Sequence, residues 1–368
     1  MKKYLLLLAA VIISVGCIAQ KKSNGYTLTG TCALLSDNDK VFLCAIGNSL
    51  IIADSTFVKD GKFTFTGSIQ GADLRVLVAL KDDIPVSQAL IVLENADISV
   101  KMPADNTPPE VLGSRNYDLY TQFSVLMDEY TQKSQSAWEI LSDPNSSIDD
   151  RIIAKDTFEV YNSKQNAYAA EFIYNNIPNL VSDMLLKYYY QDLSDNDKKR
   201  ILDKMKKEMP NAPNYQHIIE EMRINASLAV GKQIIDIELN DMDGKPVKLS
   251  DIYSKNKYTL IDFWASWCAP CLAEMPNIIH QYALYQSKGF EIYGISLDNN
   301  KNNWQAAVKR YYMAWIQVSD LKGWQSAACA KYNVKSIPAM FLVNQKGEII
   351  AKDLRGEALA NTLSTLFN

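Results

Sequence analysis

The segment that most constrains the fold is an apolar strand that runs directly into two cysteines and then into a helix. Residues 258–265 read "YTLIDFWA", an apolar run interrupted only by Asp262, and Cys268 and Cys271 follow at once. The next stretch, "PCLAEMPNIIHQYALYQ", repeats apolar side chains with helical spacing. Further along, "EIYGISL", "AMFLVNQKGEIIAKDL" and "ALANTLSTLF" predict a strand, a hairpin and a closing helix. Buried strands that alternate with helices predict an α/β layer fold over residues 230–368.

A different pattern precedes this region. Residues 20–112 contain short runs of β-branched and aromatic residues separated by polar turn clusters, which predicts a small all-β domain, sandwich-like in form. Asp60-Gly61 predicts a hairpin turn between "STFVK" and "KFTFT", because both central positions of such a turn need positive φ. Phe63 and Phe65 alternate with threonines, so we expect one face of that hairpin to be buried.

Residues 113–229 change to helical periodicity, which predicts a helical region between the β domain and the α/β domain. Ser194, with Asp197 three residues later, is typical of a helix start with a capping box. The expected helices cover residues 117–141, 148–174, 180–190, 194–209 and 215–224.

Cys32 and Cys44 flank the polar turn "SDNDK" and are interpreted as lying on one β-hairpin. A symmetric hairpin would place them opposite each other, so a disulfide is one alternative. A bridge between adjacent strands is geometrically awkward, and cysteine is common as a small buried apolar residue. We therefore favour two free, buried thiols.

The N-terminus is predicted to carry an export signal. Lys2 and Lys3 precede an apolar run that ends near Val15, which is too short to span a bilayer. The signal covers residues 1–19 if it is cut after Ala19, whereas "SVGC" resembles a lipobox whose cut would leave Cys17 as a lipidated N-terminus. Both alternatives stay open. Both predict a protein of the periplasm or cell envelope. Only the cut before Cys17 would attach it to a membrane, through the lipid anchor.

Charge and composition exclude several classes of function. The net charge is -4 with scattered Lys and Arg, which does not fit a nucleic-acid-binding surface. A zinc site needs four ligands, yet after Cys271 the next candidates are His280 and Cys329, with no second close pair. We expect no metal and no bound cofactor, and we interpret Cys329 as a buried helix residue.

The position of the cysteine pair predicts thiol chemistry. Cys268 falls at a helix N-terminus, where free N–H groups and the helix dipole stabilise a thiolate, the form that attacks disulfides. Cys271 lies one turn later and can resolve the mixed disulfide. Asp262 is costly to bury unless it has a use, such as exchanging a proton with Cys271. Trp267 can shield the pair, and Pro276 is expected to kink the helix.

Pro338 stands immediately before the apolar strand "AMFLV", where proline removes a ladder hydrogen bond. A cis Ile337–Pro338 bond explains this position, because such a turn can hold its backbone against the cysteine pair. It would leave the Ile337 backbone free to pair with an extended substrate segment. An ordinary trans proline that opens a strand is the alternative.

The residues "IDFWASWCAPC", "EMP", "KGFEIYGISLD", "YNVKSIPAMFLVNQKGEI" and "LRG" resemble the thioredoxin-like domain of TlpA/ResA-type thiol-disulfide oxidoreductases. The resemblance implies that Cys268 attacks, Cys271 resolves, Asp262 accepts a proton and Pro338 is the cis-proline. It gives Glu274 and Pro276 supporting positions, and the entrance "IIDIEL" departs from the family pattern. The β domain resembles a domain of unassigned role that precedes such domains in Gram-negative envelope proteins.

The leading hypothesis is a thiol-disulfide oxidoreductase that reduces disulfide-containing envelope proteins and receives electrons from a membrane thiol donor. Trp267 and Ile337 are the expected substrate contacts. Oxidase or isomerase activity would use the same residues. A thiol peroxidase is less favoured, because position 265 is Ala where that chemistry needs Thr. An envelope binding protein with a thioredoxin-like scaffold is a further alternative.

Overall fold

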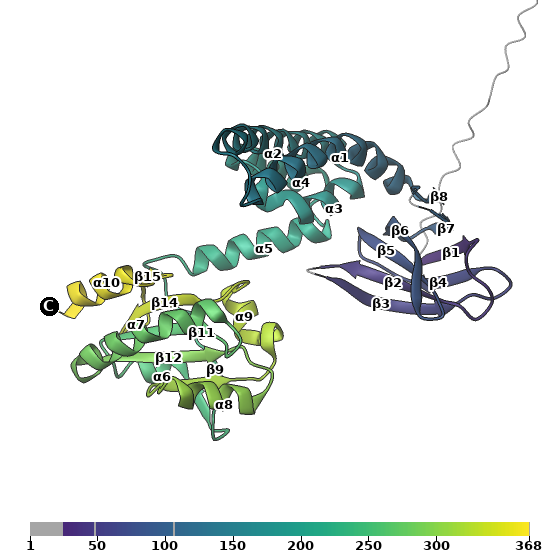
Figure 1. Cartoon of the computed structure of the whole chain (residues 1–368). Coiled ribbons are helices and arrows are strands. Elements are labelled where there is room, and N and C mark those ends of the chain that lie inside the picture. Colours follow the sequence, from purple (N-terminus) through teal and green to yellow (C-terminus); the bar gives the residue numbers. More distant parts are fainter. Residues whose placement is uncertain (1–24, 48, 106, 368) are drawn as a thin grey trace, which may run out of the picture. The chain divides into compact units, whose positions relative to one another are not determined.

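The computed structural model describes residues 25–47, 49–105 and 107–367 (Figure 1). The expected signal segment, residues 1–19, and Cys17 therefore lie outside the described residues. The chain divides into two compact units, one that ends at Gln216 and one that begins at His217. Within the described ranges, no helix is both long and apolar enough to cross a membrane.

The first unit begins with two four-stranded sheets that pack face to face around one core. One sheet has the order β4-β1-β7-β8 and the other β3-β2-β5-β6. Leu28 and Ile98 from the first sheet share the core with Leu77 and Ile91 from the second. The predicted all-β domain is therefore a sandwich. The strands are β1 (Tyr26–Cys32), β2 (Lys40–Ile46), β3 (Leu50–Phe57), β4 (Phe63–Gly67), β5 (Ala72–Lys81), β6 (Ile84–Glu94), β7 (Asp97–Met102) and β8 (Glu110–Leu112).

The turn at Asp60-Gly61 is confirmed, but the hairpin predicted around it is wrong. Asp60 and Gly61 have φ of 52° and 70°, and the alternate residues Phe63 and Phe65 are buried. However, β3 pairs with β2 and β4 pairs with β1, so the two strands join different sheets, and the isolated bridge between Lys59 and Lys62 belongs to the turn itself. The turn carries the chain from one sheet of the sandwich to the other, because β3 and β4 form their hydrogen-bonded ladders with β2 and β1 rather than with each other.

The hairpin expected around "SDNDK" is wrong for the same reason. Cys32 lies in β1 and Cys44 in β2, and these strands belong to different sheets. Both thiols are free and buried, as favoured from the sequence. Burial raises the pKa of the Cys44 thiol.

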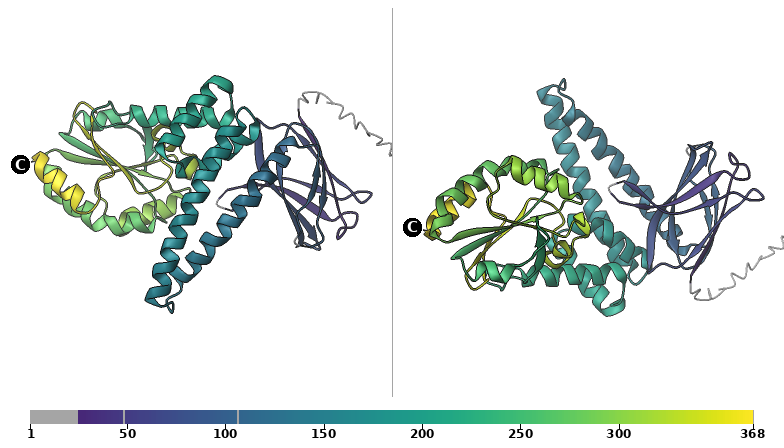
Figure 2. Two further views of the ribbon diagram at one scale, coloured as in Figure 1. Left: turned by 90° about the horizontal axis from the view of Figure 1, so that it is seen from above. Right: turned by 90° about the horizontal axis from the view of Figure 1, so that it is seen from below.

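The helical region follows the sandwich; its first four helices lie in the same unit, whereas α5 crosses the boundary between Gln216 and His217. The two long helices α1 and α2 lie side by side as a hairpin (Figures 1 and 2), where the rings of Phe123 and Tyr168 stack 5.5 Å apart. Ser194 is the N-cap that was predicted, and its Oγ accepts the Asp197 N–H at 3.1 Å. The helices are α1 (Arg115–Ser142), α2 (Ile148–Asn176), α3 (Leu180–Tyr189), α4 (Asp195–Glu208) and α5 (Pro213–Ser227).

The second unit contains the predicted α/β domain, which has a thioredoxin-like fold. Its seven-stranded sheet has the order β10-β9-β13-β12-β11-β14-β15, in which β11 is parallel to β12 and antiparallel to β14. The strands are β9 (Glu238–Asp241), β10 (Pro246–Lys248), β11 (Tyr258–Trp264), β12 (Phe290–Ser296), β13 (Ile316–Ser319), β14 (Ala339–Asn344) and β15 (Ile349–Lys352). The helices are α6 (Leu249–Tyr253), α7 (Ala269–Tyr285), α8 (Lys301–Arg310), α9 (Ala327–Tyr332) and α10 (Glu357–Phe367).

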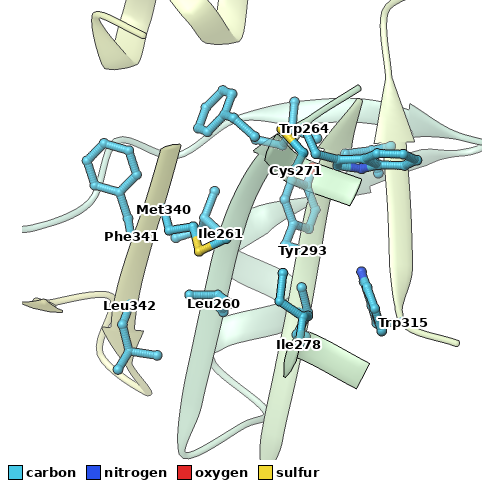
Figure 3. Close-up of a cluster of buried hydrophobic side chains, with 14 of the residues drawn as sticks. Leu260, Ile261, Trp264, Cys271, Ile278, Tyr293, Trp315, Met340, Phe341 and Leu342 are labelled. Carbon is cyan, nitrogen blue, oxygen red and sulfur yellow. The ribbon is translucent and has the colours of Figure 1, made fainter. Parts of the chain in front are cut away.

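The central strand β11 gives the domain a rigid base. It is hydrogen-bonded on both edges and buried along almost its whole length. Figure 3 shows apolar side chains from β11, β12, β14 and α7 gathered in one core, among them Leu260, Tyr293, Leu342 and Ile278. Cys271 belongs to the same core. The loop that leaves β11 and carries the cysteine pair therefore starts from a fixed point.

Candidate active site

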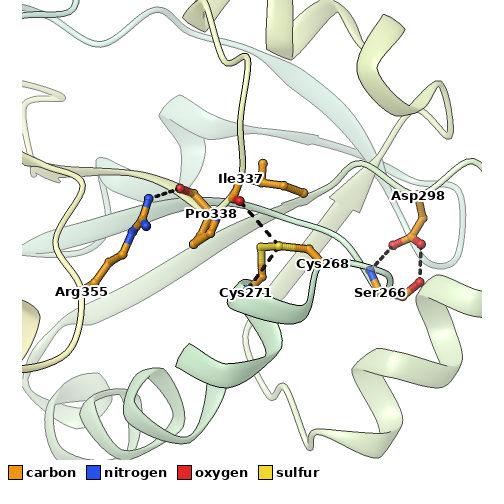
Figure 4. Close-up of a disulfide and its surroundings, with 7 residues drawn as sticks. All are labelled: Ser266, Cys268, Cys271, Asp298, Ile337, Pro338 and Arg355. Atoms are coloured by element: carbon orange, nitrogen blue, oxygen red, sulfur yellow. Dashed lines mark hydrogen bonds between the residues drawn. A yellow bond between two sulfur atoms is a disulfide. The ribbon is translucent and has the colours of Figure 1, made fainter. Parts of the chain in front are cut away.

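Cys268 and Cys271 are joined by a disulfide at the start of α7. Cys268 is the N-cap of this helix, and its Sγ accepts the backbone N–H of Cys271 at 3.2 Å (Figure 4). Both cysteines are buried, but Cys268 is 5% exposed and Cys271 1%, so Cys268 is the more exposed residue of the pair. The helix N-terminus favours negative charge at Cys268, which fits the attacking position expected from the sequence.

The loop before β14 meets this disulfide. The Ile337–Pro338 peptide bond is cis, as predicted. The Sγ of Cys268 lies 3.7 Å from the carbonyl oxygen of Ile337 (Figure 4). Two segments far apart in the sequence therefore come together at the sulfur that is expected to react.

Asp262 is a wholly buried carboxyl in β11. Among the described residues, neither of its oxygens has a hydrogen-bond partner. Burial raises its pKa from 3.8 to about 7, the charge of Glu274 adds to the rise, and the Arg355 guanidinium opposes it. A carboxyl with this pKa changes its charge near neutral pH and can take up or release a proton there.

The same shift predicts how stability depends on pH. The pKa of Asp262 in the folded state lies above its ordinary value. The stability that the neutral carboxyl contributes to the free energy of unfolding is therefore complete below pH 3.8 and is lost as pH rises to about 7. The difference between about 7 and 3.8, at 1.36 kcal/mol per unit, gives about 4 kcal/mol as an upper bound. We expect Asp262→Asn to unfold with a free energy higher than wild type by about 2–4 kcal/mol at pH 8, and without such a gain at pH 3.5.

Denaturant unfolding of the two oxidised proteins checks this prediction. Trp138 is the only one of the six tryptophans outside the second unit, so tryptophan fluorescence follows mainly the unit that holds Asp262. A free energy of unfolding at pH 8 that is higher for wild type than for Asp262→Asn would contradict this prediction.

Glu274 links α7 to the loop that follows β15. Its Oε1 accepts the backbone N–H of Gly356 at 2.7 Å and the Nδ2 amide of Asn277 at 2.6 Å. Arg355, the residue before Gly356, donates a hydrogen bond to the carbonyl oxygen of Pro338 (Figure 4). Arg355 therefore touches the Pro338 loop and acts electrostatically on Asp262. In the sequence, Arg355 stood out only as part of the motif "LRG", and no role was predicted for it.

Asp298 fixes the loop between β11 and the cysteine pair. Its buried carboxylate accepts the N–H of Ser266 at 3.0 Å and the Oγ–H of Ser266 at 2.5 Å (Figure 4). It also accepts the Oγ–H of Ser296 at 2.7 Å. Sequence reasoning missed both Ser266 and Asp298, because their pairing joins residues 32 positions apart.

The remaining predicted residues take varied positions. Trp267 is 53% exposed, and its ring lies 6.1 Å from the ring of Trp324, which the sequence did not single out. Helix α7 continues through Pro276, and the expected kink stays a prediction. Cys329 is buried in α9, as predicted, and burial raises the pKa of its thiol to about 11. Across the described ranges, no group of three or more His, Cys, Asp or Glu side chains could hold a metal ion.

A thioredoxin-like fold with a two-cysteine disulfide at a helix start defines a thiol-disulfide exchange domain. Residues 230–352 match the AhpC/TSA family, and residues 26–120 match a domain of unknown function, DUF4369.

Curated relatives belong to the same class. The thiol-disulfide oxidoreductase ResA of Bacillus cereus is 30% identical over 125 residues, which cover 34% of this chain and 69% of the relative. ResA of Bacillus subtilis is 30% identical over 124 residues, 34% of this chain and 66% of the relative. The solved thioredoxin domain of a thiol-disulfide oxidoreductase from Bacteroides vulgatus is 36% identical, covering 39% of this chain and 100% of that one with a TM-score of 0.36. The chain belongs to the ResA family of thiol-disulfide oxidoreductases.

Proposed function

We propose that the protein reduces disulfides of cell-envelope proteins through Cys268 and Cys271. The Cys268 thiolate attacks one sulfur of the substrate disulfide, and the other substrate sulfur leaves and takes up a proton. Cys271 then attacks the Cys268 sulfur of the mixed disulfide and releases the second substrate thiol. Two electrons pass from the enzyme dithiol to the substrate, and the enzyme is left with the Cys268–Cys271 disulfide.

The division of roles rests on one observation. The Sγ of Cys268 caps α7 and lies next to the Ile337 carbonyl oxygen, and Cys268 is 5% exposed whereas Cys271 is 1% exposed. A substrate can reach the first sulfur more easily than the second, so Cys268 is assigned the attack and Cys271 the resolution. The backbone of Ile337, next to Pro338, is the proposed contact for an extended substrate segment, and the exposed ring of Trp267, the residue before Cys268, is the second proposed contact.

Asp262 is proposed to accept the proton of Cys271. A thiol must lose its proton before it attacks a disulfide. Asp262 is buried in the same domain core, in the strand that leads into the cysteine loop, and its pKa of about 7 suits a base at neutral pH. Glu274, Pro276 and Arg355 are proposed to support this arrangement rather than to react.

Charge favours reduction over oxidation as the direction. A strong oxidant stabilises its reduced, thiolate form. Here Ala269 and Pro270 offer no charge or side-chain donor to a thiolate, while Asp262 and Glu274 add negative charge to this part of the domain. We therefore expect the Cys268 thiolate, although favoured by the helix N-terminus, to be less stabilised than in a strong oxidant, so that the disulfide is relatively stable and the dithiol is a reductant. Oxidase or isomerase activity is the competing direction.

The reduction potential of the cysteine pair tests this direction. We expect a value nearer about -270 mV, as in thioredoxin, than about -120 mV, as in a strong periplasmic oxidant. Titration in thiol-disulfide buffers with quantification of both cysteine states measures it, and Cys271→Ser, which cannot close the pair, is the control. A potential near the upper value would overturn the direction while leaving the exchange chemistry intact.

The cellular setting belongs to the same proposal. Lys2, Lys3 and the apolar run after them support export, and "SVGC" supports a lipid anchor at Cys17. A reductase outside the cytosol needs electrons from a membrane thiol donor to reopen the Cys268–Cys271 disulfide after each turnover.

A further inference from the structure

We propose that Trp267 and Trp324 form an aromatic docking surface for an apolar side chain next to the substrate cysteine that Cys268 attacks. This inference rests on the proposed function and adds the substrate class to it. The two rings lie 6.1 Å apart at an angle of 53°, and 53% of Trp267 and 47% of Trp324 is exposed. Large exposed aromatic residues beside a reacting group are typical of a partner-binding surface.

The backbone that carries Trp324 is held in place although its side chain is exposed. Trp324 lies in the short turn Gly323–Gln325, between β13 and α9. Asp320 accepts the backbone N–H groups of Lys322 and Ala327 at 3.2 and 3.3 Å. The Oγ of Ser319 accepts the N–H of Leu321 at 3.0 Å. These side-chain bonds fix the loop on both sides of the ring.

The backbone that carries Trp267 is also fixed. Ser266, the preceding residue, gives both its N–H and its Oγ–H to the buried Asp298. Cys268, the following residue, begins α7. Both tryptophans therefore extend from ordered segments before any substrate arrives. Such preorganisation reduces the entropy lost on binding.

The chemistry of the surface favours an apolar occupant. Trp267, Ala269 and Pro270 are exposed, Ile337 is half-buried beside the Cys268 sulfur, and Trp324 extends the surface from the ring of Trp267. None of these five side chains is charged. Tryptophan faces can also attract cations, but no carboxylate among these residues would compensate a lysine or arginine that loses water there. An aliphatic side chain has no such loss.

The test uses the reduced full chain and peptides that carry one cysteine joined to 2-nitro-5-thiobenzoate. The residue next to that cysteine is Leu, Ser, Glu or Lys, and release of the coloured thiol gives the second-order rate constant. We expect the Leu peptide to react about 10-fold faster than the Ser peptide, the lower end of what an apolar contact contributes to selectivity. Trp324→Ala should bring this ratio close to one, and Trp324→Phe should restore part of it.

Trp138→Ala is the matched control. Trp138 is 56% exposed and has an aromatic neighbour, Phe158, but it lies on α1 in the first unit. This variant should keep the wild-type ratio of the Leu and Ser rates. The ratio is independent of how much protein is active, so a partly misfolded Trp324→Ala sample would lower both rates without changing the ratio.

The other outcomes each overturn a defined claim. Equal rates for Leu and Ser peptides with wild type, or an unchanged ratio in Trp324→Ala, would overturn the docking surface but leave the oxidoreductase function standing. A preference for the Lys peptide would replace the apolar occupant by a cation. Failure to reduce even the mixed disulfide of 2-mercaptoethanol and 2-nitro-5-thiobenzoate would overturn the proposed function itself, and this inference with it.

Discussion

Cys268→Ser is expected to lower the rate of protein-disulfide reduction at least about 10³-fold, because removal of a nucleophile removes the first covalent step. A serine hydroxyl at this helix N-terminus is neutral at physiological pH and does not attack a disulfide. Turnover of a protein disulfide with an external thiol as electron source measures the loss. Cys44→Ala is the control, because Cys44 is a free cysteine in the other unit and should be dispensable for the reaction.

Cys271→Ser should behave differently, and the contrast separates the two roles. The Cys268 thiolate can still attack, but the mixed disulfide cannot be resolved from within the enzyme. Intact-mass measurement of Cys271→Ser mixed with substrate should therefore show one substrate half bound per enzyme. Accumulation of the adduct in Cys268→Ser instead would reverse the assigned roles. An adduct in neither variant, with turnover retained in both, would remove the pair from the mechanism.

The site was predictable from sequence where its geometry follows from local chemistry. The apolar run of β11, the cysteine spacing and the helical pattern of α7 fix the positions of Cys268 and Cys271 within a few residues. Pro338 was predictable because a proline before a buried strand needs an explanation. These features depend on neighbours in the chain, which a single sequence displays.

The contacts that support the site were not predictable, since they join distant segments. Arg355 donates to the Pro338 carbonyl across 17 positions, and Asp298 holds Ser266 across 32. Trp324 sits in the polar stretch "DLKGWQS", which has no strand or helix period. Only the folded sheet brings its ring to Trp267.

In the β domain, too, contacts between distant segments could not be predicted from the sequence. The Asp60-Gly61 turn was correct because both residues adopt the positive φ that it requires. The partners of the flanking strands were wrong, because sheet pairing is decided by burial across the sandwich. β1, for example, pairs in parallel with β7, a strand some 70 residues later, which no local pattern indicates.

Asp262→Asn is expected to lower the rate of the resolving step about 10²-fold at pH 7 and to change its pH dependence. In wild type, Asp262 must be ionised to accept the Cys271 proton, so the rate should rise through pH about 7, the pKa of this carboxyl, and then level off. In the variant the rise should move to higher pH, where the thiol loses its proton to solvent. Single-turnover release of the second substrate thiol from a preformed mixed disulfide measures this step separately from the first attack.

A matched control and the stability of the variant decide how such a loss is interpreted. Asp251→Asn removes an exposed carboxylate from α6 in the same domain and should leave the profile unchanged. Because Asp262→Asn is expected to be more stable than wild type at pH 8, a slower resolving step there cannot be attributed to unfolding. If Asp262→Asn is more stable than wild type, resolves the mixed disulfide more slowly, and shows its rise in rate at higher pH, the buried carboxyl is the proton acceptor. A variant with the wild-type pH profile would show that Cys271 loses its proton by another route, and the charge of Asp262 would then affect stability alone.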